Sequence, residues 1–318
     1  MNRTTTTTNG RPWSRLSAVR LGLLLGILGL FTIGIGLVYA GEKAPSTVSA
    51  DATTSAIQAL DASSDARLSA QADAVMEKLH LPKGTHHRGS KSTWAAQPGR
   101  AARVAVDMVA LDVNERLVSA VQMDEAGNLQ MATRLDLPTS ASLVVSSDVA
   151  RANAAAAASG IGFALDGQAV VAADPSTGGW VVSWTRSSSG APVPGDGTTV
   201  YVWPDGTVSG VSHITRDLAP APQQTMTLAQ ATAKAQGYLD RLVPSAHRKD
   251  YSGISVTQSW VPANGQFVAK PPAGVDTTLH LCWVARVQTS GETAASMREV
   301  AFYIDAGTGA LLGGDQTE

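Results

Sequence analysis

Hydrophobic residues first gather in one charge-free run, Leu21–Ala40, and beyond it they alternate with polar residues in short segments. At about 1.5 Å rise per residue, a helix over this run crosses the ~30 Å hydrocarbon core of a bilayer. Four arginines and no acidic residue precede the run: Arg3, Arg11, Arg15 and Arg20. Because positive flanks stay in the cytoplasm, we expect a cytoplasmic stub at 1–20, a transmembrane signal-anchor at 21–40 and an extracytoplasmic bulk.

A cleaved secretory signal is the alternative interpretation of the same run. Val38 and Ala40 are small residues that suit cleavage after Ala40, which would make the rest a secreted protein. The apolar region of a signal peptide is typically about 7–15 residues long, shorter than this run. The length therefore favours a single-pass membrane protein.

The next segment, 41–102, is predicted as a tether, a helical stalk and a basic loop. Residues 41–55 are polar, and between Ile57 and Leu79 apolar residues fall at the three- and four-residue spacings of an amphipathic helix. Pro82 and Gly84 follow and end the pattern. This helix is either a stalk above the membrane or the first helix of the folded domain.

Residues 103–145 are predicted as a degenerate β unit. Apolar and polar residues alternate over 103–113, 117–123 and 129–135, which is typical of half-buried strands. Gly127 lies between the last two segments and permits the backbone of a tight turn. We expect an antiparallel hairpin there.

Two fuller units follow, at 146–216 and 225–318. Each is predicted to begin with a helix: Ser147 precedes an alanine-rich segment, and Thr227 with Gln230 matches a capping box. Strand patterns follow each helix, at 180–186, 198–203, 207–211, 254–260, 278–287 and 300–305. The fold predicted is α+β, an N-terminal transmembrane helix followed by tandem helix-on-antiparallel-sheet modules that pack side by side.

The two units also match each other as an internal repeat. Trp180–Arg186 aligns with Leu281–Arg286, and each is followed by a polar loop, an aromatic strand and a turn that contains Asp and Gly. The turn residues are Asp205-Gly206 in one unit and Asp305-Ala-Gly307 in the other. Gln122–Leu129 is a degenerate third copy of the same turn.

The last unit resembles the PepSY domain, a small α+β module of metallopeptidase propeptides and bacterial envelope proteins. The resemblance rests on the helix Thr227–Ala235, the strand Trp283–Val287 and the ending Phe302–Leu312, similar to "VDAxTGxIL". The chain departs from the family in a Pro- and Gly-containing insertion around 261–274. The resemblance implies binding or restraint of an exported protein such as a peptidase, and it provides no catalytic residues.

Composition narrows the possible partners. The chain has 24 Lys and Arg against 26 Asp and Glu; without the four N-terminal arginines, 20 against 26 remain, a net charge of −6. A mildly acidic exported part argues against nucleic-acid binding. The single cysteine, Cys282, lies in an apolar segment, and we expect a buried thiol.

No motif for catalysis or metal binding stands out. The six histidines show no HExxH spacing, and the serines show neither G-x-S-x-G nor a lysine three positions later. Asp124, Asp205 and Asp305 recur at turns, where such residues usually bond their own backbone. We expect no catalytic residue, no metal and no cofactor.

Two groups of residues are candidate contact sites. The tryptophans of the predicted strands would line a peptide groove or fill the core between helix and sheet: Trp180, Trp184, Trp203 and Trp283. The basic residues after Leu81 would touch an anionic surface or lie in a solvated linker: Lys83, Arg88, Lys91, Arg100 and Arg103.

These observations predict a membrane-anchored, extracytoplasmic binding or regulatory protein without chemistry of its own. Its partner would be an exported protein or peptide, and an open sheet edge would suit an added strand. The alternative is a structural or assembly component of the cell envelope.

Overall fold

The computed structural model describes residues 57–59, 62–136, 144–271, 273–291, 293 and 297–317. The predicted signal-anchor at 21–40 and the polar tether at 41–55 lie outside these residues. Within the described part, no helix is both long and apolar enough to cross a membrane.

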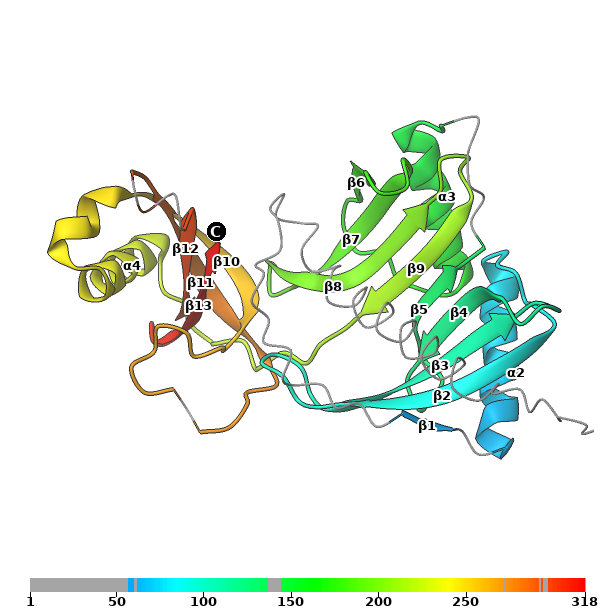
Figure 1. Cartoon of the computed structure of the whole chain (residues 1–318). Helices are drawn as coiled ribbons and strands as arrows, with labels where there is room; N and C mark the ends of the chain where they lie inside the picture. Colours follow the sequence, from blue (N-terminus) through cyan, green and yellow to red (C-terminus); the bar gives the residue numbers. More distant parts are fainter. Residues whose placement is uncertain are drawn as a thin grey trace, which may run out of the picture. The chain divides into compact units, whose positions relative to one another are not determined.

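Three units follow one another, and each is a helix followed by four strands (Figure 1). The first unit comprises α2(Ala62–Lys78), β2(His86–Trp94), β3(Arg103–Leu111), β4(Leu117–Met123) and β5(Leu129–Arg134). The second comprises α3(Ser147–Gly160), β6(Val170–Ala173), β7(Trp180–Ser188), β8(Ala191–Val202) and β9(Val208–Ile214). The third comprises α4(Leu228–Leu242), the 3-10 turn η3(Ser245–Asp250), β10(Tyr251–Pro262), β11(Leu279–Thr289), β12(Glu299–Asp305) and β13(Leu311–Thr317). All neighbouring strands pair antiparallel, so the predicted α+β class with antiparallel sheets is confirmed.

The helix starts follow their sequence signals. Thr227 caps α4, with its side chain bonded to the Gln230 N–H and the Gln230 side chain bonded to the Thr227 N–H. Ser146, one residue before the predicted cap, accepts a hydrogen bond from the Val149 N–H at the start of α3. Along α4 the buried stripe is Ala231, Ala235 and Leu239. Small buried residues let these helices lie close to their sheets.

The first two units share one nine-stranded sheet in the order β1-β2-β3-β4-β5-β9-β8-β7-β6, where β1(Ile57–Ala59) extends the β2 side. Each unit contributes an antiparallel meander, and the last strands of the two meanders, β5 and β9, pair with each other. The third unit keeps its own four-stranded sheet in the order β10-β11-β12-β13. The first two units are therefore joined by strand pairing within one sheet, whereas the third unit is not part of that sheet.

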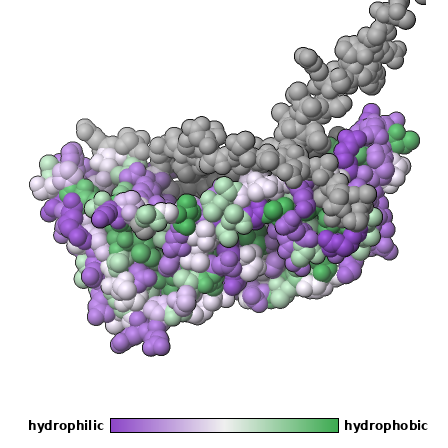
Figure 2. Space-filling view, turned by 90° about the horizontal axis from the view of Figure 1, so that it is seen from below, coloured by the Kyte–Doolittle hydropathy of each residue, from purple (hydrophilic) through white to green (hydrophobic). Residues whose placement is uncertain are grey.

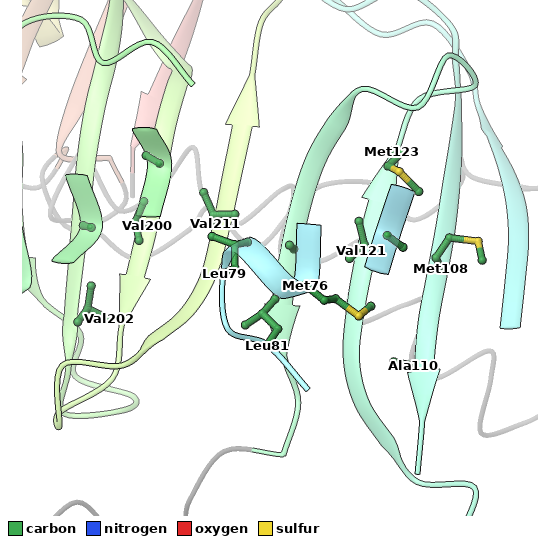
Figure 3. Packing of buried hydrophobic residues seen from close by; sticks show 14 of the residues in the cluster. Met76, Leu79, Leu81, Met108, Ala110, Val121, Met123, Val200, Val202 and Val211 are labelled. Carbon is green, nitrogen blue, oxygen red and sulfur yellow. The ribbon is translucent and has the colours of Figure 1, made fainter. Parts of the chain in front are cut away.

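One hydrophobic core joins the first two units. Residues of both α2 and α3 pack in the same cluster with residues of the shared sheet, so the two helices cover one face. Figure 3 shows Met76 of α2 over strand residues such as Met108, Val121 and Met123. Burial of these side chains is the main stabilising contribution of the shared sheet.

The third unit has a separate core and meets the second unit through side chains. Phe302 and Ile304 pack with Ala235 and Leu239 of α4. At the junction, Trp260 of β10 packs with Ala191 and Val193 at the start of β8. The Trp260 indole N–H donates to the Ser188 carbonyl at 2.9 Å.

The structure differs from the predicted division at 41–102. α2 packs in the core, so of the two alternatives for this helix it is the first helix of a domain. His86–Trp94, expected within a basic loop, is strand β2 and pairs along its length with β3. The degenerate unit at 103–145 is therefore the second part of a complete first unit.

Candidate functional site

The backbone edges of the two sheets are the places where another chain could add a strand. Edge strands present unpaired N–H and C=O groups, and proteins usually cover or shorten them. The edges here are β1 and β6 of the nine-stranded sheet and β10 and β13 of the four-stranded sheet. They differ in what lies against them.

The β13 edge is covered by the chain itself. The Asn264 side-chain amide donates to the Gly314 carbonyl at 2.7 Å and accepts from the Gly314 N–H at 3.0 Å. The Gly265 N–H donates to the Leu312 carbonyl at 3.0 Å. These three bonds occupy the positions that a neighbouring strand would use.

The β10 edge lies against the second unit. Besides the bond from Trp260 to Ser188, the Ser259 hydroxyl donates to the Pro192 carbonyl at 3.3 Å. The hairpin between β7 and β8 thus covers the later half of β10. At the opposite end of the nine-stranded sheet, β1 covers β2 over three residue pairs.

The β6 edge carries no cover within the described part of the chain. The Asp174 N–H donates to the Gly179 carbonyl at 2.9 Å, which closes the β6–β7 hairpin. Because bonded pairs alternate along an antiparallel ladder, Val170 and Ala172 direct their backbone groups to β7. Val171 and Ala173 therefore direct their N–H and C=O groups outward.

The surroundings of β6 have a defined shape and charge. Val170 is 47 % exposed, while Val171 packs against the shared core. Asp174 follows β6 directly and holds the turn to β7 through hydrogen bonds from Ser176 and Thr177. Burial acts to raise the pKa of Asp174, but these hydrogen bonds hold it below its ordinary value. The open edge therefore has an apolar side chain and a carboxylate at the end that leads into the β6–β7 turn.

Of the four candidate tryptophans, Trp184 is buried and the other three are half-buried. Trp184 is 5 % exposed within the shared core, and Trp180 packs beside it with its indole N–H bonded to the Val145 carbonyl at 2.9 Å. Trp283 packs in the cores of the third unit and of its junction. The indole nitrogens of Trp203 and Trp283 are buried without a hydrogen-bond partner among the described residues. The structure does not bring the four to one surface, and a partner contact by them stays a prediction.

Three of the five candidate basic residues form ion pairs within the first unit. Lys83 pairs with Glu77 at 2.9 Å, Arg88 with Glu115 at 3.3 Å and Lys91 with Glu125 at 2.9 Å. The acidic partners lie in α2 and in two turns of the sheet. These pairs leave less free positive charge than the sequence suggests.

The other two basic residues lie near the hairpin between β2 and β3. The Arg103 guanidinium lies over the Trp94 ring, 5.4 Å from its centroid. Burial, followed by the charge of Arg216, lowers the pKa of Arg100. Contact of these residues with an anionic surface stays a prediction.

A buried charge cluster near Arg100 was missed by sequence reasoning. The Asp196 side chain is fully buried and accepts hydrogen bonds from Arg186, at 3.3 Å, and from the side chain and backbone N–H of Arg216. Arg186 also donates to the Arg216 carbonyl at 2.9 Å. The cluster fixes the segment that leaves β9. Its members lie 10 to 30 residues apart in the sequence and match no motif.

The remaining polar groups show no assembly for catalysis or metal binding in the described ranges, where no three His, Cys, Asp or Glu residues could hold an ion. Asp124, Asp205 and Asp305 each accept hydrogen bonds from backbone N–H groups of their own turns. Cys282 is buried, and burial raises the pKa of its thiol. Figure 2 shows hydrophobic and hydrophilic residues intermixed over the described part of one face.

Comparisons with known proteins add little to this picture. No protein-family model matches the chain, and no curated protein matches it. Among solved structures, the Bacillus megaterium YpeB C-terminal domain is similar, at 14 % sequence identity and a TM-score of 0.39. The match covers 82 % of this chain and 99 % of that one. We draw no functional argument from a likeness of this size, and the resemblance to PepSY domains stays a prediction.

Proposed function

We propose that this chain is a non-catalytic binding protein, anchored at the outer side of a membrane, that holds an extended segment of an exported protein along β6. One observation carries the proposal: β6 presents an outward backbone edge with no cover among the described residues, whereas β13 and the later half of β10 are covered. A strand added to such an edge gains main-chain hydrogen bonds without requiring a pocket.

The residues around β6 suggest which segment would bind. Val171 and Ala173 offer two outward N–H and C=O pairs, enough for a short strand. The exposed Val170 favours an apolar partner side chain on its face of the sheet. Asp174 favours lysine or arginine at one end of the segment. We expect an extended segment with an apolar centre and a basic residue at one end.

A proline at the outward edge tests this binding mode. Ala173→Pro removes an outward N–H and places a ring on the edge, while the bonds of Ala172 to β7 are kept. Ala173 is exposed, so the exchange removes no core packing. Ala173→Ser is the matched control because it changes the side chain and keeps the N–H.

The readout is a photo-crosslinker in place of Val170 in the full chain, expressed in cells, with the adduct identified by mass spectrometry. We expect an adduct with an extended segment of an exported protein, lost in Ala173→Pro and kept in Ala173→Ser. An adduct that survives Ala173→Pro would contradict strand addition. Adducts with lipid or cell-wall polymer alone would favour the structural role in the envelope.

A further inference from the structure

The last strands of the three units are equivalent, residue by residue. In each unit the hairpin before this strand contains one register shift next to an Asp-containing turn. The pair that directly follows the shift along the last strand is Gln122–Met131 in the first unit, Tyr201–Gly210 in the second and Tyr303–Gly313 in the third. Met131, Gly210 and Gly313 are therefore equivalent positions of β5, β9 and β13. The next residue directs its backbone outward in all three units. These outward residues are Ala132, Val211 and Gly314.

The first two outward residues face each other in the shared sheet. Ala132 pairs with Val211, and on either side Met131 pairs with Ser212 and Thr133 with Gly210. The residue before Ala132 thus pairs with the residue after Val211, and the residue after Ala132 pairs with the residue before Val211. The β5–β9 joint has the local symmetry of two identical strands related by a two-fold axis.

The third outward residue, Gly314, meets a side chain instead of a strand. The covering segment, residues 263–268, we call the strap. Its Asn264 amide bonds both backbone groups of Gly314, as a facing peptide group would. The Phe267 ring anchors the strap against Phe302 with centroids 5.7 Å apart. Phe267 has a φ of 66°, a left-handed conformation that is uncommon for a bulky residue.

We propose that the strap guards a self-association edge, and that β13 pairs with β13 of a second copy of this chain when the strap is displaced. The register follows from the β5–β9 joint: Gly314 faces Gly314 of the second copy, and Gly313 faces Asp315. A second copy fits this edge because the chain already contains the same pairing between two equivalent strands. Gly313 and Gly314 present no side chain that would obstruct it. The proposal is independent of strand addition at β6.

The first test removes the Asn264 side-chain amide from the strap. It uses the full chain, kept in detergent. Asn264→Ala deletes both bonds to Gly314, and Gln266→Ala is the matched control within the strap, since Gln266 contributes only its backbone N–H to the bonds of the strap. By sedimentation, we expect the dimer dissociation constant of Asn264→Ala to fall at least ~tenfold, the effect of a side-chain bond of ordinary strength. Gln266→Ala should sediment like the unchanged chain.

The second test fixes the register. Leu312 of one copy would face Gln316 of the other, at a Cα separation of about 5.5 Å that a disulfide spans. In the Asn264→Ala background, Leu312→Cys and Gln316→Cys chains should crosslink when mixed and much less when each is alone.

Two outcomes would overturn the proposal. One is an Asn264→Ala chain that keeps the cooperative unfolding of the unchanged chain and stays monomeric. The other is crosslinking of the mixed chains no faster than of each chain alone. Phe267→Ala loosens the strap through its anchor while Asn264 remains, so it repeats the test if Asn264→Ala does not fold.

Discussion

The β5–β9 joint and the β13 edge use the same strand position in two different ways. At the joint, Ala132 and Val211 satisfy each other and are both fully buried. At the β13 edge, a single asparagine side chain satisfies the equivalent Gly314. The comparison shows that the last strand is where each unit makes its lateral contact, and that a side chain can substitute for a neighbouring strand there. The third unit must therefore attach to the rest by other means.

The largest effect should come from that other attachment. Trp260 is 2 % exposed at the junction, so Trp260→Ala should lower the free energy of unfolding by about 3–5 kcal/mol. Trp260→Phe keeps an aromatic ring and loses the bond to Ser188, which should cost about 1 kcal/mol in hydrogen bonding, besides some packing. Denaturant unfolding measures both variants. If both variants lose the same small amount of unfolding free energy, the junction contributes little to stability.

The next effect concerns the joint itself. Val211→Pro removes the N–H that bonds Ala132 and leaves a buried carbonyl unpaired, so we expect a loss of about 3 kcal/mol in unfolding free energy. Val211→Ala, which keeps the N–H and removes only methyl groups, should cost less. If the two variants unfold alike in denaturant, the ladder between β5 and β9 is not what holds the first two units together.

A smaller effect is expected at the β13 edge. Asn264→Ala removes the two hydrogen bonds to Gly314 and two exposed or part-buried bonds, to Asp315 and from the Gln266 N–H. It should cost about 1–2 kcal/mol, below the cost of Val211→Pro. Gln266→Ala should stay within about 0.5 kcal/mol of the unchanged chain. Thermal unfolding of the three chains ranks them. If Asn264→Ala lowers the unfolding free energy as much as Val211→Pro does, the Asn264 side chain stabilises its edge as strongly as a paired strand, which contradicts this ranking.

The smallest effect is a pH dependence next to the same edge. Burial raises the pKa of Asp315 on β13, against the opposing hydrogen bond from Tyr303. Because Asp315 holds its proton more tightly in the folded state, the protonated carboxyl contributes to the free energy of unfolding. This contribution is complete below the ordinary pKa of 3.8 and is lost as pH rises through the raised pKa. Asp315→Asn should flatten this decline in unfolding free energy above pH 4. An unchanged pH profile would contradict a buried titrating carboxyl.

Much of the fold could be predicted from local signals. The capping box at Thr227, the hairpin turns at Asp124 and Asp205, and the strand at 117–123 all lie where the pattern placed them. Strand β2 was missed because His86–Trp94 is polar and its stability comes from the ladder with β3. Strand β6 is only four residues long and carries no alternation that distinguishes it from a loop.

The candidate site could not be predicted because it depends on strand order. A sequence does not tell which strands lie at the edges, and the β5–β9 pairing joins residues about 80 positions apart. Asn264 lies in the insertion around 261–274, which in sequence is only a departure from the PepSY pattern. Its role is visible only in the structure, where its side chain bonds Gly314, a residue 50 positions later in the sequence.

Amide hydrogen exchange at Gly314 tests the central claim most directly, because it reports whether the strap satisfies the outward backbone of β13. In the unchanged chain we expect the Gly314 amide to be protected, and Asn264→Ala should raise its exchange rate about tenfold, the effect of one lost hydrogen bond. The Ala132 and Val211 amides, held by the β5–β9 ladder, should exchange at the same slow rate in both chains. Equally fast exchange at Gly314 in the two chains would contradict the account.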